Sequence, residues 1–234
     1  MLFLPSCGSK SSTGYTVAID PSFFPLNIQG KEGKVYVFMH DLLSTIADVE
    51  GIQIKKVNVA WDQVLSSVRE GNVDGAVTML MPYSFNKENY SFSHRVLHTG
   101  PSLIVPKSSK VKGIPDLDKG VLYVPDNTQR QFVMSDAPDV STRVYEFVPQ
   151  VLDRILREDG SGALVETVQA ISYVNDLYGD TLKIAKGPIG DEGLRVITKK
   201  GENAALIDAI NSGLEKLKLD GTYEKLARKW QVLP

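Results

Sequence analysis

Two segments that lie far apart in the chain share one design, an amphipathic helix stopped by a glycine turn. The first is the range 61–75, in which apolar residues recur at helical spacing until Gly71. The second is the C-terminal range 214–230, which Gly221 divides into two helical patterns. Because glycine adopts the left-handed backbone conformation without strain, it commonly follows the last residue of a helix. Both segments therefore predict short helices with one apolar face.

Short β-rich runs alternate with such helices along the chain. In the first third, strands are predicted at 15–20, 52–59 and 76–80, and helices at 41–50 and 61–70. Later strands are predicted at 121–124, 145–147, 163–165 and 193–198, and later helices at 128–134, 149–158, 168–177 and 204–219. This order favours an α/β fold with mostly parallel sheets covered by helices. A single dinucleotide-binding domain is the competing interpretation, but no G-x-G-x-x-G motif follows the first strand.

The composition argues against several kinds of function. Hydrophobic residues make up 42% and charged residues 23% of the 234 residues, which is ordinary for a globular protein with a full core. The 26 basic residues nearly balance the 28 acidic ones without a polybasic run, so nucleic acid is not an expected partner. No apolar stretch reaches the roughly 20 residues that span a bilayer. His40, His94 and His98 lie in no metal-binding motif, so we expect no metal and no cofactor.

The single cysteine has a distinctive neighbourhood. Leu4 lies three residues before Cys7 and the small Ser6 just before it, which resembles a bacterial lipobox, where a lipid is attached to the cysteine. The range 9–14 is rich in serine and predicts a flexible tether. However, only six residues precede Cys7 and none is basic, whereas a secretory signal has a basic start and an apolar region of about 7 to 15 residues. We expect residues 1–14 to be a lipobox and tether; the alternatives are a misplaced or truncated start, or a stray cysteine.

Six short motifs occur in the same order as in bacterial periplasmic solute-binding proteins of the polar amino-acid type. The motifs are Ile19–Pro25, Phe38–Leu42, Trp61 with Gly71–Asp74, Tyr90–Ser93, Ile114–Gly120 and Asp220–Trp230. Each motif is weak alone, but their order and spacing make the chain resemble this family over nearly its whole length. Within the second motif, Met39 replaces an acidic residue of the family pattern.

The resemblance implies an α/β fold of two lobes, the periplasmic-binding-protein fold, in which each lobe has a mostly parallel sheet flanked by helices. Lobe 1 would contain residues 15–104 and 192–234, and lobe 2 would contain residues 108–187. Two crossing segments, near 105–107 and 188–191, would form a hinge that closes around a ligand.

The resemblance also implies a function without chemistry. The chain would be the substrate-binding component of an ABC importer, which captures an amino acid or a related small polar solute and delivers it to a permease in the membrane. It would act as a monomer in the periplasm or on the cell surface, anchored through Cys7. Two alternatives are a dehydratase-like enzyme on the same fold, with Glu166 as an acidic residue, and a surface lipoprotein that binds a ligand or mediates adhesion without transport.

On lobe 1, three residues match ligand-binding positions of the family. Asp20 follows the first strand, at the carboxyl edge where open α/β sheets bind ligands, and would accept a hydrogen bond from the ligand. Phe23 and Trp61 occupy the family's aromatic positions and would sandwich the ligand. The alternatives are an Asx-turn or a helix cap for Asp20, and core packing for both aromatic residues.

On lobe 2, the expected site residues are Thr128, Gln129 and Glu166. Thr128 and Gln129 match the family's Gly-Thr-Thr loop, where a hydroxyl and free N–H groups at a helix start bind a carboxylate; the alternative is an ordinary N-cap. Glu166 stands for the aspartate that binds the ligand's ammonium, although strict register places Thr167 there. The alternative for Glu166 is a surface or capping role.

The clearest departure from the family is a missing arginine. In the family's Thr-x-Thr-x-x-Arg pattern the arginine binds the ligand carboxylate; here Met81 replaces the threonine and Asn86 the arginine. Asparagine cannot reproduce the bidentate fork of a guanidinium. Either Lys87 or Arg130 takes over this role, or the ligand has no ordinary α-carboxylate. The methionines of this segment indicate a more hydrophobic or larger ligand.

Overall fold

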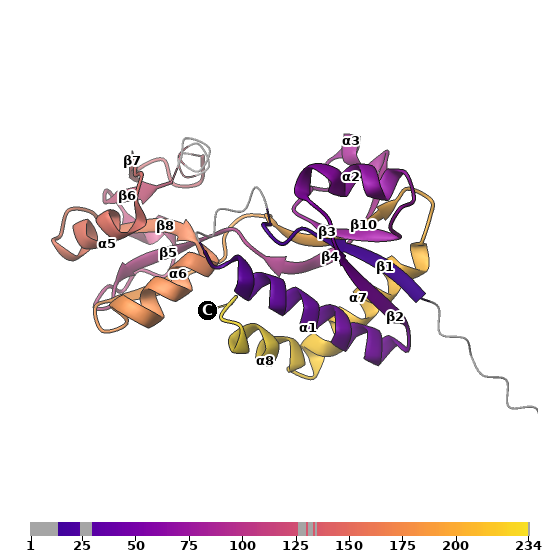
Figure 1. The fold of residues 1–234 in the computed structure, drawn as a ribbon. Coiled ribbons are helices and arrows are strands. Elements are labelled where there is room, and N and C mark those ends of the chain that lie inside the picture. The colour runs from indigo at the N-terminus through magenta and orange to yellow at the C-terminus, as the bar shows by residue number, and fades with distance from the viewer. Residues whose placement is uncertain (1–13, 24–29, 126–129, 131–132, 134, 234) are drawn as a thin grey trace, which may run out of the picture.

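The computed structural model describes residues 14–23, 30–125, 130, 133 and 135–233. Within these ranges the chain forms two five-stranded sheets with flanking helices, and the two units lie next to each other as two lobes (Figure 1). The predicted two-lobed α/β fold is therefore confirmed. Cys7, Thr128 and Gln129 lie outside the described residues.

The sheet of lobe 1 has the strand order β2-β1-β3-β10-β4. Its strands are β1 (Gly14–Ile19), β2 (Gln53–Asn58), β3 (Gly75–Thr78), β4 (Tyr90–His98) and β10 (Gly193–Lys199). Its helices are α1 (Glu32–Glu50), α2 (Trp61–Arg69), α3 (Ser84–Lys87), α7 (Ala204–Leu219) and α8 (Thr222–Lys229). Strands β1, β2 and β3 are parallel, whereas β10 runs antiparallel to both β3 and β4.

Alternate residues of this sheet belong to two separate cores. Val17 and Ile19 of β1 belong to the core that includes α1, α7 and α8, whereas Ala18 belongs to the core with Val64 and Val68 of α2. In Figure 1, α1 and α8 accordingly lie on one face of the sheet, and α2 lies on the other. This alternation follows from the two-residue period of a strand, and it places α2 beside the end of β1.

The sheet of lobe 2 has the strand order β7-β6-β8-β5-β9. Its strands are β5 (Pro101–Pro106), β6 (Val121–Val124), β7 (Ser141–Val144), β8 (Gly162–Glu166) and β9 (Leu182–Lys186). Its helical elements are the 3-10 turn η1 (Ile114–Leu117), the helices α5 (Val148–Leu156) and α6 (Thr167–Tyr173), and the π-helical turn η2 (Val174–Tyr178). As in lobe 1, the sheet has a parallel and an antiparallel part. Strand β6 is parallel to β7 and β8, whereas β5 is antiparallel to β8 and β9.

The chain passes between the two sheets twice. Strand β4 ends at His98 in the first sheet and β5 begins at Pro101 in the second, so the first crossing is the pair 99–100. The return crossing is 187–192, between β9 and β10. Hydrogen bonds of 3.2 Å from Thr99 N to Glu192 O and of 2.8 Å from Ile189 N to Pro101 O join the two segments. The expected first crossing at 105–107 falls at the end of β5, whereas the expected second crossing lies within 187–192.

Two predicted elements differ from the structure for identifiable reasons. The first helix begins at Glu32, nine residues before Asp41, because Val35, Phe38 and Met39 extend its buried face toward the N-terminus. The strand predicted at 145–147 is wrong. The strand of this region is β7, which ends at Val144, and Phe147 is an exposed residue directly before α5. Strand β7 is mostly exposed and lacks apolar alternation, so periodicity does not reveal it.

In the described parts of the chain, no helix is both long and apolar enough to cross a membrane.

Candidate functional site

A cavity of about 630 Å³ lies on lobe 1 where β1 and β3 end, against α2 and α3. Five of the predicted site residues line it together: Asp20, Phe23, Trp61, Met81 and Asn86. The described residues of its lining come from elements of lobe 1 and from the end of the return crossing. Carboxyl ends of parallel strands are the usual place for a ligand in this class of sheet.

Asp20 is held firmly at the edge of the cavity. Its side chain is buried, and its Oδ1 accepts hydrogen bonds from the backbone N of Ser22 (2.9 Å) and from Ser22 Oγ (2.8 Å). The bond to the backbone N of Ser22 is an Asx-turn, one of the alternatives considered for this aspartate. Asp20 therefore forms an Asx-turn and also lines the cavity, because the turn orients its carboxylate there.

The two aromatic residues differ in their environment. Phe23 is 3% exposed and belongs to the main core of lobe 1, although it also lines the cavity. Its φ of 52° lies in the left-handed region, which is uncommon for a bulky side chain and often marks a functional loop. Trp61, at the start of α2, is 53% exposed and is therefore a wall of the cavity without being part of the core.

Asn86 has a structural partner next to the cavity. Its Nδ2 donates a 2.8 Å hydrogen bond to the backbone O of Met81, which closes the short loop before the single turn α3. Neither Lys87 nor Arg130 is among the described residues that line the cavity, and both side chains are exposed. The two cations considered as substitutes for the missing arginine therefore do not lie on the cavity.

The predicted residues of lobe 2 do not join this cavity in the described structure. Glu166 is half-buried at the junction of β8 and α6 and is not among the lining residues. Thr167, the alternative by strict register, is buried; its Oγ1 donates a 2.6 Å hydrogen bond to the backbone O of Gly100 and lies 2.7 Å from Ser102 Oγ. Thr167 thus ties α6 to the first crossing.

Sequence reasoning missed several residues of the cavity, above all Glu192. This glutamate ends the return crossing, and its Oε2 is buried without a hydrogen-bond partner among the described residues. Asp62, at the start of α2, is a further acidic residue of the lining. Glu192 could have been suspected from its place directly after the expected crossing at 188–191. With Asp20, the described lining has three carboxylates and neither lysine nor arginine.

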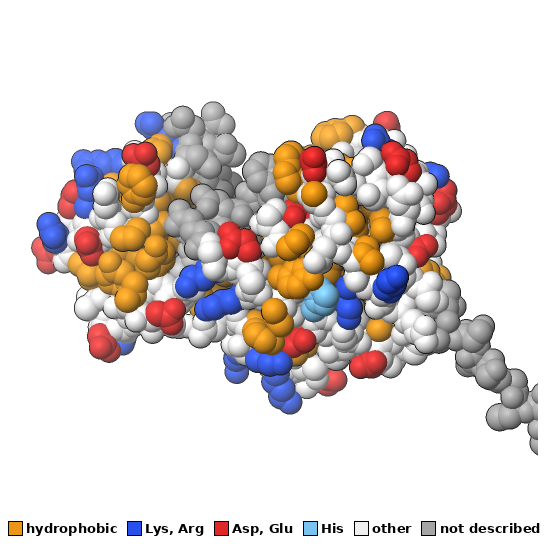
Figure 2. Space-filling model, viewed as in Figure 1, with side chains coloured by type: hydrophobic (Ala, Val, Ile, Leu, Met, Phe, Trp, Pro, Cys, Tyr) orange, Lys and Arg blue, Asp and Glu red, His pale blue; other side chains and the backbone are white. Residues whose placement is uncertain are grey.

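Exposed aromatic side chains form the outer part of the cavity. Tyr83 and Phe85 are both exposed, line the cavity and lie with their ring centroids 5.7 Å apart. Figure 2 shows hydrophobic side chains gathered on the part of lobe 1 that Figure 1 labels α2 and α3. Acidic and basic side chains are interspersed over the rest of this face. The cavity can therefore bind a compact molecule that has both an apolar part and a charged or hydrogen-bonding part.

Known proteins resemble this chain over almost its entire length. The ABC transporter glutamine-binding protein GlnH of Bacillus subtilis is 28% identical, with 98% of this chain and 92% of that protein covered. The L-cystine solute receptor of Neisseria gonorrhoeae, in its unliganded open conformation, has a TM-score of 0.72 at 20% identity and covers 94% of this chain and 93% of its own. An ancestral cyclohexadienyl dehydratase has a TM-score of 0.69 at 20% identity, with coverage of 93% and 92%. At these identities the two solved structures show the shared fold alone.

A family model also matches nearly the whole chain. The family described as bacterial extracellular solute-binding proteins, family 3, matches residues 15–232. This range includes both sheets, both crossings and every described residue that lines the cavity. The chain therefore belongs to the bacterial extracellular solute-binding proteins of family 3.

Proposed function

We propose that this protein is the substrate-binding component of an ABC importer and binds an amino acid or a related small polar solute between its two lobes. The observation that carries the proposal is the cavity at the strand ends of lobe 1, which lies directly beside the return crossing between the lobes. Its membership of the solute-binding family and its likeness to the glutamine-binding protein GlnH support the same function.

The chemistry of the cavity suits one end of an amino acid. A zwitterion in a closed cleft needs an anion for its ammonium group, because an unpaired buried charge is costly. Asp20 and Glu192 are the acceptors that we propose for this ammonium group, and Trp61 and Phe23 are the surfaces for the side chain. Closure would bring Thr128, Gln129 and Glu166 from lobe 2 to the other side of the ligand.

The two crossings supply the hinge in this proposal. Residues 99–100 and 187–192 are the connections between the sheets, and lobe 1 would consist of the chain before and after them. A hinge of two short segments allows rigid lobes to close around a ligand with few changes in backbone torsion angles. The described lining comes from one lobe and its crossing, as an open form requires.

We further propose that the protein works as a monomer outside the cytoplasmic membrane, in the periplasm or on the cell surface. A lipid anchor on Cys7 and the range 9–14 as tether would keep it beside the permease that receives the ligand. Mass spectrometry of protein extracted from membranes tests the anchor, because a lipid on Cys7 adds a defined mass that Cys7→Ala removes.

A thermal-shift screen of the purified chain against the common L-amino acids, L-cystine and short peptides tests the main proposal, with calorimetry on each hit. A ligand at about 100 times its dissociation constant adds roughly 2.7 kcal/mol to the stability of the folded state. We expect one or a few amino acids to raise the melting temperature, and Asp20→Asn to weaken their binding. If no amino acid or peptide binds at millimolar concentration, the proposal that the ligand is an amino acid is wrong.

A dehydratase is the second candidate, because among the described residues three carboxylates and no lysine or arginine line the cavity, and one carboxylate oxygen is buried without a hydrogen-bond partner there. A general acid in such an enzyme must keep a proton in the closed cleft. Incubation with a cyclohexadienyl carboxylic acid and detection of its aromatic product by absorbance distinguishes the two candidates. Turnover that Glu192→Gln abolishes supports the enzyme, whereas binding without turnover supports the importer component.

A further inference from the structure

Arg195 is a buried cation next to the cavity. It lies in β10, opposite Thr78 of β3, and its neighbour in sequence, Leu194, lines the cavity as Thr78 does. Arg195 is only 8% exposed, although arginine is almost never fully buried unless it is paired. Burial lowers the pKa of Arg195 and the nearby Arg95 lowers it further, while the charge of Asp191 opposes the shift; an arginine nevertheless remains charged at any physiological pH.

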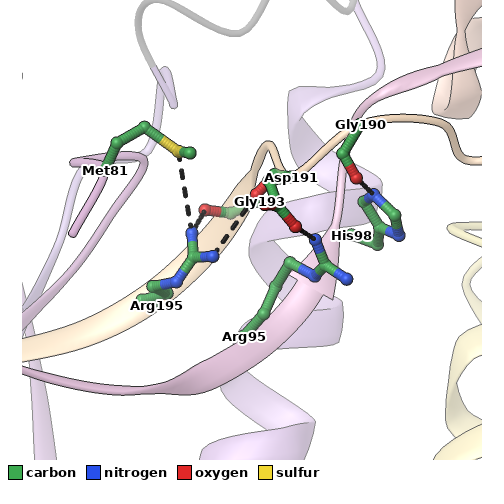
Figure 3. A network of polar contacts seen from close by, with 7 residues as sticks. All are labelled: Met81, Arg95, His98, Gly190, Asp191, Gly193 and Arg195. Carbon is green, nitrogen blue, oxygen red and sulfur yellow. Dashed lines mark hydrogen bonds and ion pairs between the residues drawn. The ribbon is translucent and has the colours of Figure 1, made fainter. Parts of the chain in front are cut away.

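The partners of this guanidinium are neutral. Nη1 donates to the backbone O of Gly193 (3.3 Å), Nη2 donates to the backbone O of Asp191 (3.3 Å), and Nη1 lies 3.9 Å from the sulfur of Met81 (Figure 3). The carboxylate of Asp191 is instead paired with Arg95, at 3.4 Å. Arg195 therefore has no ion-pair partner among the described residues, and a thioether is a weak acceptor. A buried guanidinium with five N–H donors can bind a negatively charged acceptor more strongly than these neutral groups.

Met81 contacts this guanidinium and also belongs to the cavity. Its sulfur lies 3.9 Å from Nη1 of Arg195, and the residue lines the cavity, whereas Arg195 is not among the described lining residues. The backbone of Met81 is fixed by the hydrogen bond from Asn86 Nδ2, but a methionine side chain has three rotatable bonds and adapts readily. A rotation of the Met81 side chain can thus expose Arg195 without movement of the strand. Figure 3 shows the sulfur of Met81 next to the guanidinium of Arg195.

We propose that Arg195 binds the carboxylate of the ligand after the Met81 side chain has been displaced. The inference rests on the proposed function, because an amino acid supplies the carboxylate. An arginine fork binds a carboxylate by donating two parallel hydrogen bonds to it. These charge-assisted bonds are stronger than the present contacts of Nη1 and Nη2 with neutral groups. The ammonium end of the same ligand then faces Asp20 and Glu192, so the two ends of the zwitterion meet opposite charges.

Calorimetry with pairs of probes that differ only at the carboxyl group tests this role. The pairs are L-glutamine with L-glutaminamide, L-methionine with L-methioninamide, and 3-phenylpropanoate with 3-phenylpropanamide. Wild type, Arg195→Gln, Arg195→Lys and Met81→Ala are compared, and Arg228→Gln is the control because Arg228 is an exposed arginine of α8 that does not line the cavity. For an acid that binds, wild type should prefer it over its amide by roughly 10- to 100-fold. Arg195→Gln should remove this preference, Arg195→Lys should retain part of it, and Arg228→Gln should leave it unchanged.

Three outcomes separate this inference from the proposed function. If amino acids bind and their preference over the amides survives Arg195→Gln, the importer function stands and the role of Arg195 is overturned. If 3-phenylpropanoate alone binds, in a manner that needs Arg195, the role of Arg195 stands and the amino-acid function fails. If no probe with a carboxylate binds better than its amide, the inference about Arg195 is wrong.

Met81→Ala gives a second test that leaves the buried arginine in place. Met81 also lines the cavity, so its truncation can weaken contacts that acid and amide share. Because the thioether no longer has to be displaced, the preference for each acid over its amide should rise several-fold. An equal change for acid and amide means that Met81 does not cover a carboxylate-binding group, and this overturns the inference. The Met81→Ala test therefore decides the inference even if Arg195→Gln does not fold.

Discussion

The indole Nε1 of Trp230 donates a 2.8 Å hydrogen bond to Oδ2 of Asp41, 189 residues earlier in the chain. Lys229 Nζ lies 3.0 Å from the same oxygen. Asp41 belongs to the second of the six sequence motifs and Trp230 ends the last one, so one contact connects two motifs from distant parts of the sequence. This contact holds the end of α8 against α1 and thereby ties the C-terminal segment to lobe 1.

Asp41→Asn should destabilise the protein by about 1 kcal/mol, because two donors lose their charged acceptor. Burial alone would raise the pKa of the Asp41 carboxyl, but the hydrogen bonds from Lys229 and Trp230 outweigh it and leave the pKa below its ordinary value. The contribution is thus present above the carboxyl's unfolded pKa and is lost as the pH falls through the lower folded value. Urea unfolding at neutral and at acidic pH should show a difference between wild type and Asp41→Asn only at neutral pH.

Trp230→Phe is the companion variant, since it keeps an aromatic ring, although a smaller one, and removes the N–H donor. We expect it to lose a similar amount of stability, whereas Lys229→Met, which removes a surface ion pair, should cost less than about 1 kcal/mol. Equal stability of wild type and Trp230→Phe at neutral pH would show that the indole hydrogen bond contributes nothing.

Trp61→Ala should reduce ligand binding without reducing stability. The side chain is largely exposed and lines the cavity, so its removal should change the free energy of unfolding by less than about 0.5 kcal/mol. An aromatic wall of a binding site contributes about 1 to 2 kcal/mol to binding. Calorimetry with the hit from the ligand screen measures this loss, and Leu219→Ala, which changes an exposed residue at the end of α7, is the control. Unchanged affinity in Trp61→Ala means that the ligand does not use this wall.

Gly100→Ala should disturb the connection between the lobes. A Cβ at this position would lie 1.9 Å from the backbone O of Ile189 in the return crossing, so the two segments must move apart. Overpacking of this kind costs about 1 to 3 kcal/mol. Gly33→Ala in α1 is the control, because a Cβ there meets nothing within 4 Å and alanine favours a helix by roughly 1 kcal/mol. Urea unfolding that shows no loss for Gly100→Ala would mean that the crossings are not tightly apposed.

Much of the fold could be predicted from the sequence because the strands and helices of lobe 1 carry strong local patterns. The helix α7 was predicted at its observed ends, 204–219, and Gly51 does end α1 in the left-handed conformation. Strands β5 and β9 were not predicted, since both stand in the antiparallel half of lobe 2, where tertiary contacts decide the pairing. The sequence analysis assigns 101–104 to the end of lobe 1 and the first crossing to 105–107, whereas the pairing of β5 with β8 and β9 in the second sheet puts the crossing at 99–100.

The candidate site could be predicted only where strand ends and family positions coincide. Asp20, Trp61 and Asn86 follow or flank strands, so their place at one edge of the sheet follows from the topology. Arg195 lies in β10 and Glu192 directly before it. This strand follows β3 by more than 100 residues in the sequence and pairs with it in the antiparallel direction. No local pattern signals such an approach. Ligand binding by each of these residues stays a prediction.

His98 should make stability depend on pH near the return crossing. Burial lowers the pKa of His98 below its ordinary value and the nearby Arg95 lowers it further, while the hydrogen bond with Gly190 O and the charges of Glu192 and Asp191 oppose the shift. Because the folded pKa is depressed, the unfolded state binds more protons just below the ordinary histidine pKa of about 6.5. The contribution is therefore complete above that value and is lost as the pH falls through the folded pKa.

His98→Gln removes this titration but keeps a side chain that can form a hydrogen bond with Gly190 O. We expect the free energy of unfolding of wild type to fall more steeply than that of His98→Gln between about pH 7 and 5. His40 also has a pKa lowered by burial and by Lys56, so His40→Gln in the same experiment separates its share from that of His98. Parallel curves for wild type and His98→Gln would mean that the crossing beside Gly190 does not respond to protonation. A steeper wild-type curve would instead place a pH-sensitive contact at the connection between the two lobes.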